Sequence, residues 1–290
     1  MFDRWKCEWD RTWAHRVFRK HHTQLNSLYW AHLSAANHLL KVAKAYPETA
    51  LAAEVFPIPA DDKGRKNNRL GQWSQDYKEF INWVRLNVAV SLSGYLEVYL
   101  QSAATLALES DPGTLLGAPR AIDGATLLKT KDKYSYSDYA TSVVKGTWHS
   151  RLHTYKGYFG GLPAVVESSI SELEQLRELR NGVAHVFGRE LGDYKSRINF
   201  ELKPLQRLSN ERLKKWLEVA ANVALAIDDH LREAHIGAYE VINYYHSWNR
   251  RPYSGPLRKE AAFKKHLNSV VGSRLSTVYF RELISYYESL

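Results

Sequence analysis

Apolar residues recur every three or four positions through most of the chain, and this spacing indicates amphipathic α-helices. No run of alternating apolar and polar residues is convincing as a β-strand, and no internal repeat is evident. The pattern therefore predicts an all-α protein. Its expected helices cover residues 13–46, 74–110, 137–145, 148–156, 163–187 and 209–235, with two further helical stretches between 238 and 290.

Proline and glycine set the expected ends of these helices. Pro47 ends the first, and Asp111-Pro112-Gly113 ends the second, whose apolar positions include Phe80 and Trp83. Residues 111–136 then form a Pro/Gly-containing connection, which is long for a plain link between helices. Long ordered connections inside compact domains are often functional, so this segment is a candidate for binding.

The amino-acid composition limits which binding partners and which cellular compartment are expected. The 290 residues are 44% hydrophobic and 12% aromatic and carry a formal net charge of +9, which suits a polyanionic partner met by cations and stacking rings. Cys7 is the only cysteine, so neither an internal disulfide nor a cysteine zinc cluster is available, and a reducing cytoplasm fits. No signal-peptide pattern and no long uncharged apolar run is present, so no membrane association is expected.

The hexapeptide Arg180-Asn181-Gly182-Val183-Ala184-His185 carries the candidate chemistry. Arginine is a permanent, forked cation suited to phosphate, and histidine titrates near neutrality. On a helix that advances about 100° per residue, the core stripe is expected to contain Leu176, Leu179, Val183 and Val186. Arg177, Asn181 and His185 form a separate line, one turn apart, and the small Ala184 leaves room on that polar side for a phosphate or a second helix.

Simpler explanations of this hexapeptide are also open. Cations are favoured near helix C-termini because they complement the helix dipole, which explains an Arg or His there without any function. It does not explain Asn181, a poor helix former, between them. The residues alone leave a functional site and a helix terminus equally open.

The hexapeptide resembles the hallmark of the HEPN superfamily (higher eukaryote and prokaryote nucleotide-binding domains), which is Arg, a polar residue, three variable positions and His. The preceding long helix, with SLSGYLEVYLQSA and its Glu97, and the later amphipathic helix KKWLEVAANVALAIDDHL also resemble that family. The resemblance covers residues 75–236 and implies an up-and-down helical bundle. Residues 1–74 and 237–290 are then N- and C-terminal helical extensions, and the connection between the two long helices is longer than a minimal HEPN core needs.

Active HEPN proteins are endoribonucleases that need no metal or other cofactor, and the resemblance carries this expectation to the chain. His185 would be the general acid/base, Arg180 would hold the scissile phosphate, and Asn181 would orient the phosphate or the histidine. Family members pair so that two such helices face one cleft, which implies a homodimer and products with a 2′,3′-cyclic phosphate. The resemblance also implies a toxin or anti-phage defence effector, restrained by an antitoxin or regulatory protein.

RNA-contacting residues are expected where cations and aromatic rings gather. These candidates are Arg177, Lys129, Lys131, Lys133, Tyr134, Arg250 and Arg251. His149 and His153 stand four apart but lack a third ligand in a zinc pattern, and Asp228-Asp229-His230 is expected to be an exposed polar patch. Two alternatives to the enzyme stay open: a non-catalytic HEPN-like module that binds nucleotide, RNA or protein, and a helical scaffold in which the motif only ends a helix.

Overall fold

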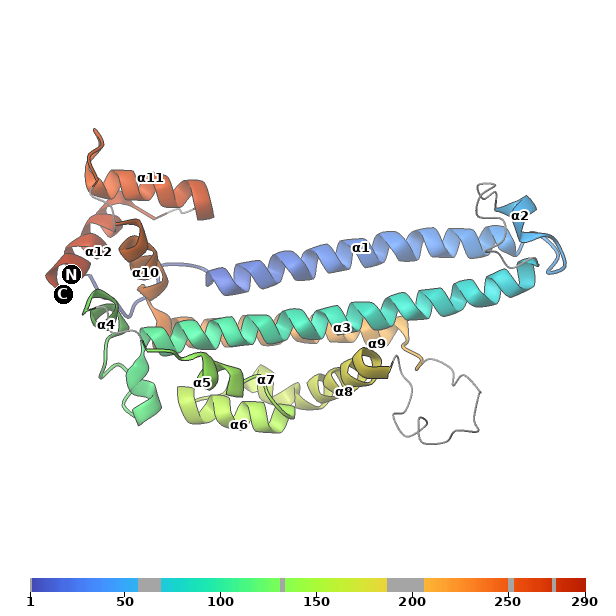
Figure 1. The fold of residues 1–290 in the computed structure, drawn as a ribbon, viewed down its shortest axis with the longest axis horizontal. Helices are drawn as coiled ribbons and strands as arrows, with labels where there is room; N and C mark the ends of the chain where they lie inside the picture. Colours follow the sequence, from blue (N-terminus) through green and yellow to red (C-terminus); the bar gives the residue numbers. More distant parts are fainter. Residues whose placement is uncertain (1, 57–68, 131–133, 187–205, 250–252, 273–274) are drawn as a thin grey trace. The chain divides into compact units, whose positions relative to one another are not determined.

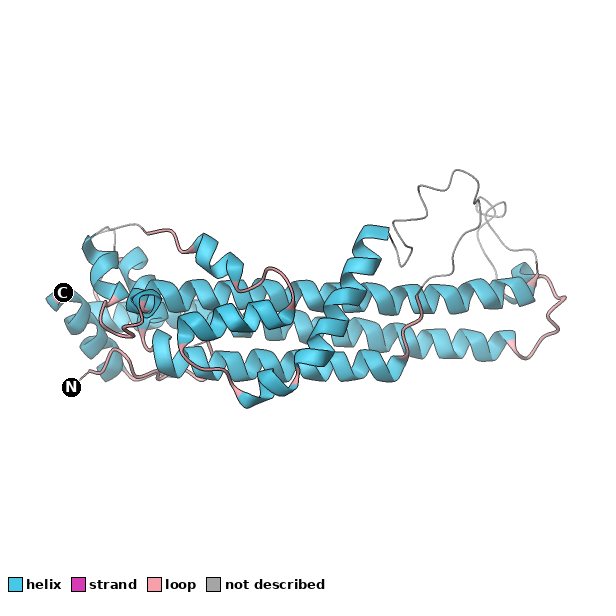
Figure 2. Cartoon of the chain, turned by 90° about the horizontal axis from the view of Figure 1, so that it is seen from below, coloured by secondary structure: helices cyan, strands magenta, loops and turns pink. Residues whose placement is uncertain are grey.

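A computed structural model describes residues 2–56, 69–130, 134–186, 206–249, 253–272 and 275–290. Within these ranges the chain forms helices and the loops between them, without a β-strand (Figure 2). The predicted all-α class is therefore confirmed. Among the described helices, none has both the length and the apolar character needed to cross a lipid bilayer.

The helices follow the predicted pattern with several differences (Figure 1). Their bounds are α1 Trp13–Ala43, α2 Ala52–Val55, α3 Leu70–Ser110, α4 Gly124–Thr130, α5 Ser137–Ser142, α6 Trp148–Phe159, α7 Ala164–Ser168, α8 Ile170–Val186, α9 Asn210–Leu231, α10 Tyr239–Trp248, α11 Lys259–Val271 and α12 Thr277–Ser289. A short 3-10 helix, η2, covers Pro112–Leu116, and a π-helical turn, η4, covers Arg232–Ile236. The connection expected over 111–136 therefore contains η2 and α4.

The helix expected over residues 163–187 is instead two helices, α7 and α8, which meet at Ser169. The hydroxyl groups of Ser168 and Ser169 both donate to the carbonyl oxygen of Val165, over 3.1 and 2.7 Å. Serine side chains that bond local carbonyls compete with the helical hydrogen-bond ladder, which accounts for a break at this position. The break gives α8 an N-terminus of its own, with Glu172 in its first turn.

The chain divides into two compact units, each made of separate stretches of sequence. We call residues 19–96 and 171–221 the motif unit, because they include the hexapeptide, and residues 1–18, 97–170 and 222–290 the terminal unit, because they include both termini. Helices α1, α3 and α9 contribute residues to both units. The predicted boundaries at 74/75 and 236/237 stay a prediction.

In the motif unit, the parts of α1 and α3 that belong to it run antiparallel alongside each other (Figures 1 and 2). Two polar contacts join α1 to α9: the Tyr29 hydroxyl donates to Asn210 Oδ1 over 2.7 Å, and His22 Nε2 lies 2.9 Å from the carbonyl oxygen of Leu217. Burial of apolar side chains supplies the main stabilisation. The buried apolar residues include Tyr29, Ala36, Ile81, Leu86, Leu92, Leu173, Leu176, Leu213 and Trp216.

The terminal unit has a core rich in aromatic residues from α10, α11 and α12, among them Tyr239, Tyr245, Phe263, Phe280 and Tyr287. The N-terminal segment is fixed by Arg4, whose guanidinium donates to Asp123 Oδ1 (2.9 Å), the Ser110 carbonyl (2.6 Å) and the Ile236 carbonyl (3.2 Å). This segment passes so close to Gly237 that a Cβ there would lie 2.4 Å from the Arg4 carbonyl oxygen. A side chain at Gly237 would therefore displace the backbone around Arg4.

Two carboxyl groups of the terminal unit cap the N-terminus of α1. The Thr12 hydroxyl donates to Asp228 Oδ1 over 2.5 Å, and the Trp13 amide donates to Glu240 over 3.0 and 3.1 Å. The Trp13 amide lacks a helical partner, and the carboxyl oxygens of Glu240 satisfy it. Asp228 is buried, so the expectation of an exposed patch at Asp228-Asp229-His230 is wrong for this residue.

Glu97, which interrupts an apolar face of α3, has a partner in the same unit. Arg151 Nη2 lies 2.9 Å from Glu97 Oε1, and Arg151 Nε also donates to the Gly146 carbonyl over 3.1 Å. Both side chains are largely buried, at 6% exposure for Arg151 and 18% for Glu97. A charge on an apolar helical face is tolerated here because α6 supplies its counterion.

Candidate functional site

The hexapeptide lies in the last two turns of α8, and the helix presents one apolar and one polar side. The apolar stripe is buried as predicted for Leu176, Leu179 and Val183, and Leu173 extends it toward the N-terminus. Arg177, Arg180 and Asn181 are partly exposed, and Ala184 is exposed. Within the motif, Arg180, Asn181 and Ala184 therefore lie outside the core stripe, to which Val183 belongs, as helical geometry requires.

The first two motif residues contact each other. Arg180 Nη1 donates to Asn181 Oδ1 over 2.9 Å, which fixes the direction of the guanidinium and turns the amide oxygen toward it. One turn earlier, Arg177 makes two bonds to Glu174 Oε1, of 3.0 and 2.5 Å. An i,i+3 ion pair of this kind stabilises a helix by about 0.2–0.5 kcal/mol. Arg177 thus bonds a carboxylate of its own helix, and Arg180 bonds the next residue of the motif.

His185 lies in α8, but its side chain is outside the part of the chain that the structure describes. The same holds for Val186, the last expected member of the core stripe. Lys131, Lys133, Arg250 and Arg251 fall outside the described residues altogether. Their roles at the candidate site stay predictions.

The start of α8 is joined to α9 through Glu172. Its carboxylate accepts from Lys215 Nζ (2.6 Å) and from Trp216 Nε1 (3.0 Å), and Arg212 lies 3.5 Å away. These partners, with Lys215 first, lower the pKa of Glu172 below its ordinary value. Glu172 therefore stays ionised at neutral pH, and this arrangement fixes the position of the helix that carries the motif.

The segment 206–209 runs beside α8 and is held by α3. The Asn82 side chain donates to the Gln206 carbonyl over 2.9 Å and accepts from the Leu208 amide over 3.0 Å, and Arg85 donates to the Leu208 carbonyl over 3.1 Å. A Cβ at Gly182 would lie 3.9 Å from Gln206 Oε1, so this segment reaches the motif itself.

An open groove of about 520 Å³ lies along the same segment. Gln175, Glu178 and Leu179 of α8 form one side, and Arg207, Arg212 and Trp216 are among the residues of the other. The hexapeptide begins one residue after Leu179, so in the sequence it directly follows the residues of α8 that line the groove. Both arginines of the groove are ion-paired within the motif unit, Arg207 with Glu79 and Arg212, over 3.5 Å, with Glu172.

An aromatic ladder in the motif unit was not expected from the sequence. Centroid distances between successive rings of Phe56, Trp73, Tyr77, Phe80 and Trp83 are 4.2, 4.8, 6.1 and 5.9 Å. Phe80 and Trp83, two apolar positions of the expected helix, are 46% and 39% exposed. The aromatic spacing of four, three and three residues along α3 was the available signal.

Two predicted RNA-binding residues, Lys129 and Tyr134, belong to the terminal unit, whereas the hexapeptide belongs to the motif unit. Lys129 Nζ donates to the carbonyl oxygens of Tyr287 and Glu288, over 3.1 and 2.9 Å. Its ammonium group therefore caps the C-terminal end of α12. Tyr134 is 64% exposed.

The two histidines weighed as metal ligands, His149 and His153, lie on the surface of α6, where both are exposed. Among the described residues, no group of three or more His, Cys, Asp or Glu side chains is arranged to hold a metal ion.

Comparisons of the chain with protein-family models, with curated proteins and with solved structures found no match.

Proposed function

We propose that the chain is a metal-independent endoribonuclease of the HEPN type, which cuts RNA at a site composed from two copies of the chain. The observation that carries this proposal is the Arg180–Asn181 pair on the partly exposed side of α8, away from the buried stripe of the same helix. An arginine that served only to end a helix would not need a neighbouring amide to orient it. Phosphate recognition does need an oriented guanidinium.

The proposed reaction is attack of the RNA 2′-hydroxyl on the adjacent phosphorus. His185 accepts the 2′-hydroxyl proton, the O2′–P bond forms, and the P–O5′ bond breaks. The departing O5′ takes a proton from the His185 of a second chain, which leaves a 2′,3′-cyclic phosphate and a 5′-hydroxyl end. Arg180 stabilises the charge that develops on the phosphoryl oxygens, and Asn181 orients its guanidinium.

A homodimer follows from the number of groups that this reaction needs. One hexapeptide supplies a single histidine for two proton transfers. A two-fold axis beside α8 would bring a second histidine into the same cleft. Ala184, exposed and small, would let the two helices approach closely. We propose, by analogy with the family it resembles, that this activity belongs to a toxin or anti-phage effector with a restraining protein partner.

The purified protein is expected to cleave total RNA in excess EDTA and to leave 2′,3′-cyclic phosphate ends. Mapping of the ends, together with the molar mass in solution, tests the reaction and the dimer at once. Because each site needs two chains, the rate per chain should rise with protein concentration until the dimer is fully formed. RNA binding without cleavage would favour the non-catalytic binding module instead. Loss of cleavage in EDTA would contradict the metal-independent mechanism.

The aromatic ladder is expected to help capture unpaired RNA. Each base stacked on an aromatic side chain contributes about 1–3 kcal/mol. We therefore expect Phe80→Ala and Trp83→Ala each to lower the affinity for a single-stranded oligonucleotide by about fivefold or more, which corresponds to about 1 kcal/mol. Fluorescence anisotropy with a labelled oligonucleotide measures this. Leu28→Ala, which removes another exposed apolar side chain of the motif unit, should leave the affinity unchanged. Equal affinities for all four proteins would contradict the role of the ladder.

A further inference from the structure

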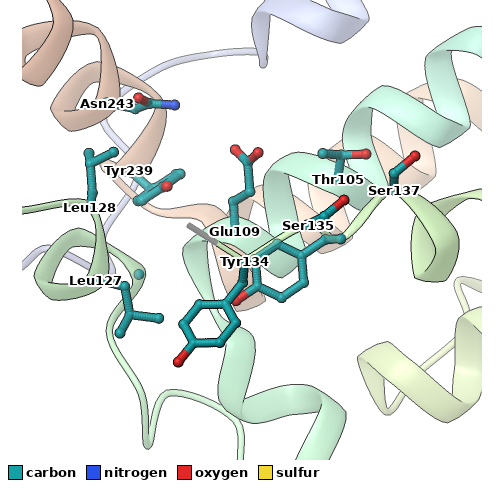
Figure 3. Close-up of a pocket in the computed structure, with 11 residues that line it drawn as sticks. Thr105, Glu109, Leu127, Leu128, Tyr134, Ser135, Ser137, Tyr239 and Asn243 are labelled. Carbon is teal, nitrogen blue, oxygen red and sulfur yellow. The ribbon is translucent and has the colours of Figure 1, made fainter. Parts of the chain in front are cut away.

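The terminal unit contains a cavity of about 530 Å³ that the proposed RNA chemistry does not use. The end of α3 contributes Glu109, α4 contributes Leu127 and Leu128, and α10 contributes Tyr239. Residues 134–137, between α4 and α5, also line it. Figure 3 shows the Glu109 carboxyl group projecting into this space between Tyr239 and Thr105.

The walls around this carboxyl are aromatic and neutral. Tyr134, Tyr136 and Tyr239 all line the cavity. Burial, together with the negative charge of Glu109, raises the pKa of Tyr136 and of Tyr239 above the ordinary value, so both phenols stay protonated at neutral pH. Glu109 is the one carboxylic acid among the described lining residues, in a chain whose net charge is +9, and burial raises its pKa above the ordinary value.

Glu109 has no hydrogen-bond or ion-pair partner among the residues that the structure describes. The two described cations of this region are engaged elsewhere. Arg4 lies 5.6 Å from the centroid of the Tyr239 ring, but its donors are taken by Asp123, Ser110 and Ile236. Lys129 donates to carbonyl oxygens at the end of α12. A partly buried carboxylate without a counterion is costly, and a cation in the cavity would offset that cost.

Packing of the helices keeps the cavity in place. Gly124, at the start of α4, approaches α3 so closely that a Cβ would lie 1.8 Å from the Glu109 carbonyl oxygen. Asp123 Oδ1 accepts from the Ala125 amide over 2.9 Å and also from Arg4, which fixes this end of α4. The Glu109 carboxyl group and the apolar wall thus belong to α3 and α4, which pack closely against each other. The site is therefore largely preformed before a ligand binds.

We propose that this cavity binds a small organic cation, with an alkylammonium or guanidinium head group beside Glu109 and its apolar part against Leu127 and Leu128. Tyrosine rings attract such weakly hydrated cations through their π-electrons, and a carboxylate completes the recognition. A hard cation such as Mg²⁺ or Ca²⁺ is a poor match, because it requires about six or more oxygen ligands and the cavity offers one carboxylate among neutral groups. The proposal does not depend on the ribonuclease activity.

Calorimetric titration of the full-length protein with choline and with butylguanidinium tests this proposal. The control ligand is 3,3-dimethylbutan-1-ol, the neutral isostere of choline. Both cations should bind in a saturable manner, and the neutral alcohol should bind at least about tenfold more weakly, as the loss of cation–π and carboxylate attraction requires. Two results would overturn the proposal. One is that neither cation binds at a concentration of about 10 mM, because a dissociation constant above that is too weak for a preformed site. The other is that the alcohol binds as tightly as the cations.

Three variants identify the site. Glu109→Gln should weaken cation binding about tenfold, and Tyr136→Leu about threefold, at the lower end of measured cation–π contributions. Glu167→Gln, at an exposed position on α7, should have no effect. Unchanged affinity in Glu109→Gln, with a far-ultraviolet circular dichroism spectrum like that of the parent, would overturn the proposal. So would a tenfold gain in affinity in Lys131→Ala/Lys133→Ala, because it would identify a lysine of this chain as the occupant.

Discussion

Arg180→Ala and His185→Ala are each expected to slow RNA cleavage by a factor of about 10²–10⁴. General acid–base catalysis by one histidine contributes a factor of this size, and so does a preorganised donor at the charge of the transition state. In a two-fold site, each substitution removes both copies of the residue at once, so no intact group is left in the cleft. The measurement is the single-turnover rate on a defined oligonucleotide in EDTA, with the protein concentration held above the dimer dissociation constant.

Matched variants separate this effect from a loss of folding or a contaminating nuclease. Arg19→Ala removes an exposed arginine of the motif unit, and His153→Ala removes an exposed histidine of α6, so both should cleave at the parental rate. Arg180→Lys keeps the charge but loses the fork that bonds Asn181, and its rate should fall between those of the parent and Arg180→Ala. Parental rates for Arg180→Ala and His185→Ala, prepared free of other nucleases, would refute the proposed function.

The helix that carries the motif was predictable because helical geometry is local. The burial of Leu176, Leu179 and Val183 requires only a period of 3.6 residues and one apolar neighbour. The break at Ser169 was missed because it depends on side-chain hydroxyl groups that bond a nearby carbonyl. Serine is common inside helices, so the residue type alone does not distinguish the two cases.

Contacts between distant parts of the chain were beyond the sequence pattern. Thr12 and Asp228 are 216 positions apart, and Glu97 and Arg151 are 54 apart. Nothing local to Asp228 distinguishes a buried helix cap from a surface carboxylate, and Glu97 looks unfavourable until α6 supplies its counterion. The exposed side of the aromatic ladder was missed for the same reason. Hydrophobicity indicates that a ring favours burial, but only the positions of neighbouring helices decide which rings are covered.

In the candidate site, too, local contacts could be predicted from the sequence and contacts between distant residues could not. The Arg180–Asn181 contact joins adjacent residues, and a helical projection was enough to place both outside the core stripe. The groove beside Leu179 depends on the segment 206–209, which Asn82 of α3 holds in place. The second half of the proposed site belongs to another chain, so no pattern within one sequence specifies its geometry.

The stability of the protein is expected to fall as the pH rises from about 5 to 8, through the carboxyl group that caps α1. Burial raises the pKa of Glu240 from an ordinary value of 4.5 to about 8, and the nearby charge of Asp228 acts in the same direction. Between these two values the folded chain holds a proton that the unfolded chain has lost. The free energy of unfolding therefore decreases with rising pH across this window, by at most about 1.4 kcal/mol per pH unit, and levels off above pH 8.

Glu240→Gln should remove this dependence, because the amide oxygen can still accept from Trp13 without ionising. The variant is expected to match the parent near pH 5 and to be more stable by roughly 3 kcal/mol at pH 9, after allowance for partial solvent exposure of the group. Urea unfolding followed by circular dichroism measures the difference at each pH. The comparison must be made between variants because His230 also titrates in this range. Burial lowers the pKa of His230 below its ordinary value of 6.5, so this histidine destabilises the parent as the pH falls below 6.5. Its effect opposes the pH dependence that Glu240 causes.

Glu218→Gln, at an exposed position of α9, is the control and should follow the parental curve. If Glu240→Gln followed it as well, Glu240 would have to be ionised in the folded protein at neutral pH, with the Trp13 amide and the α1 dipole outweighing the cost of its burial.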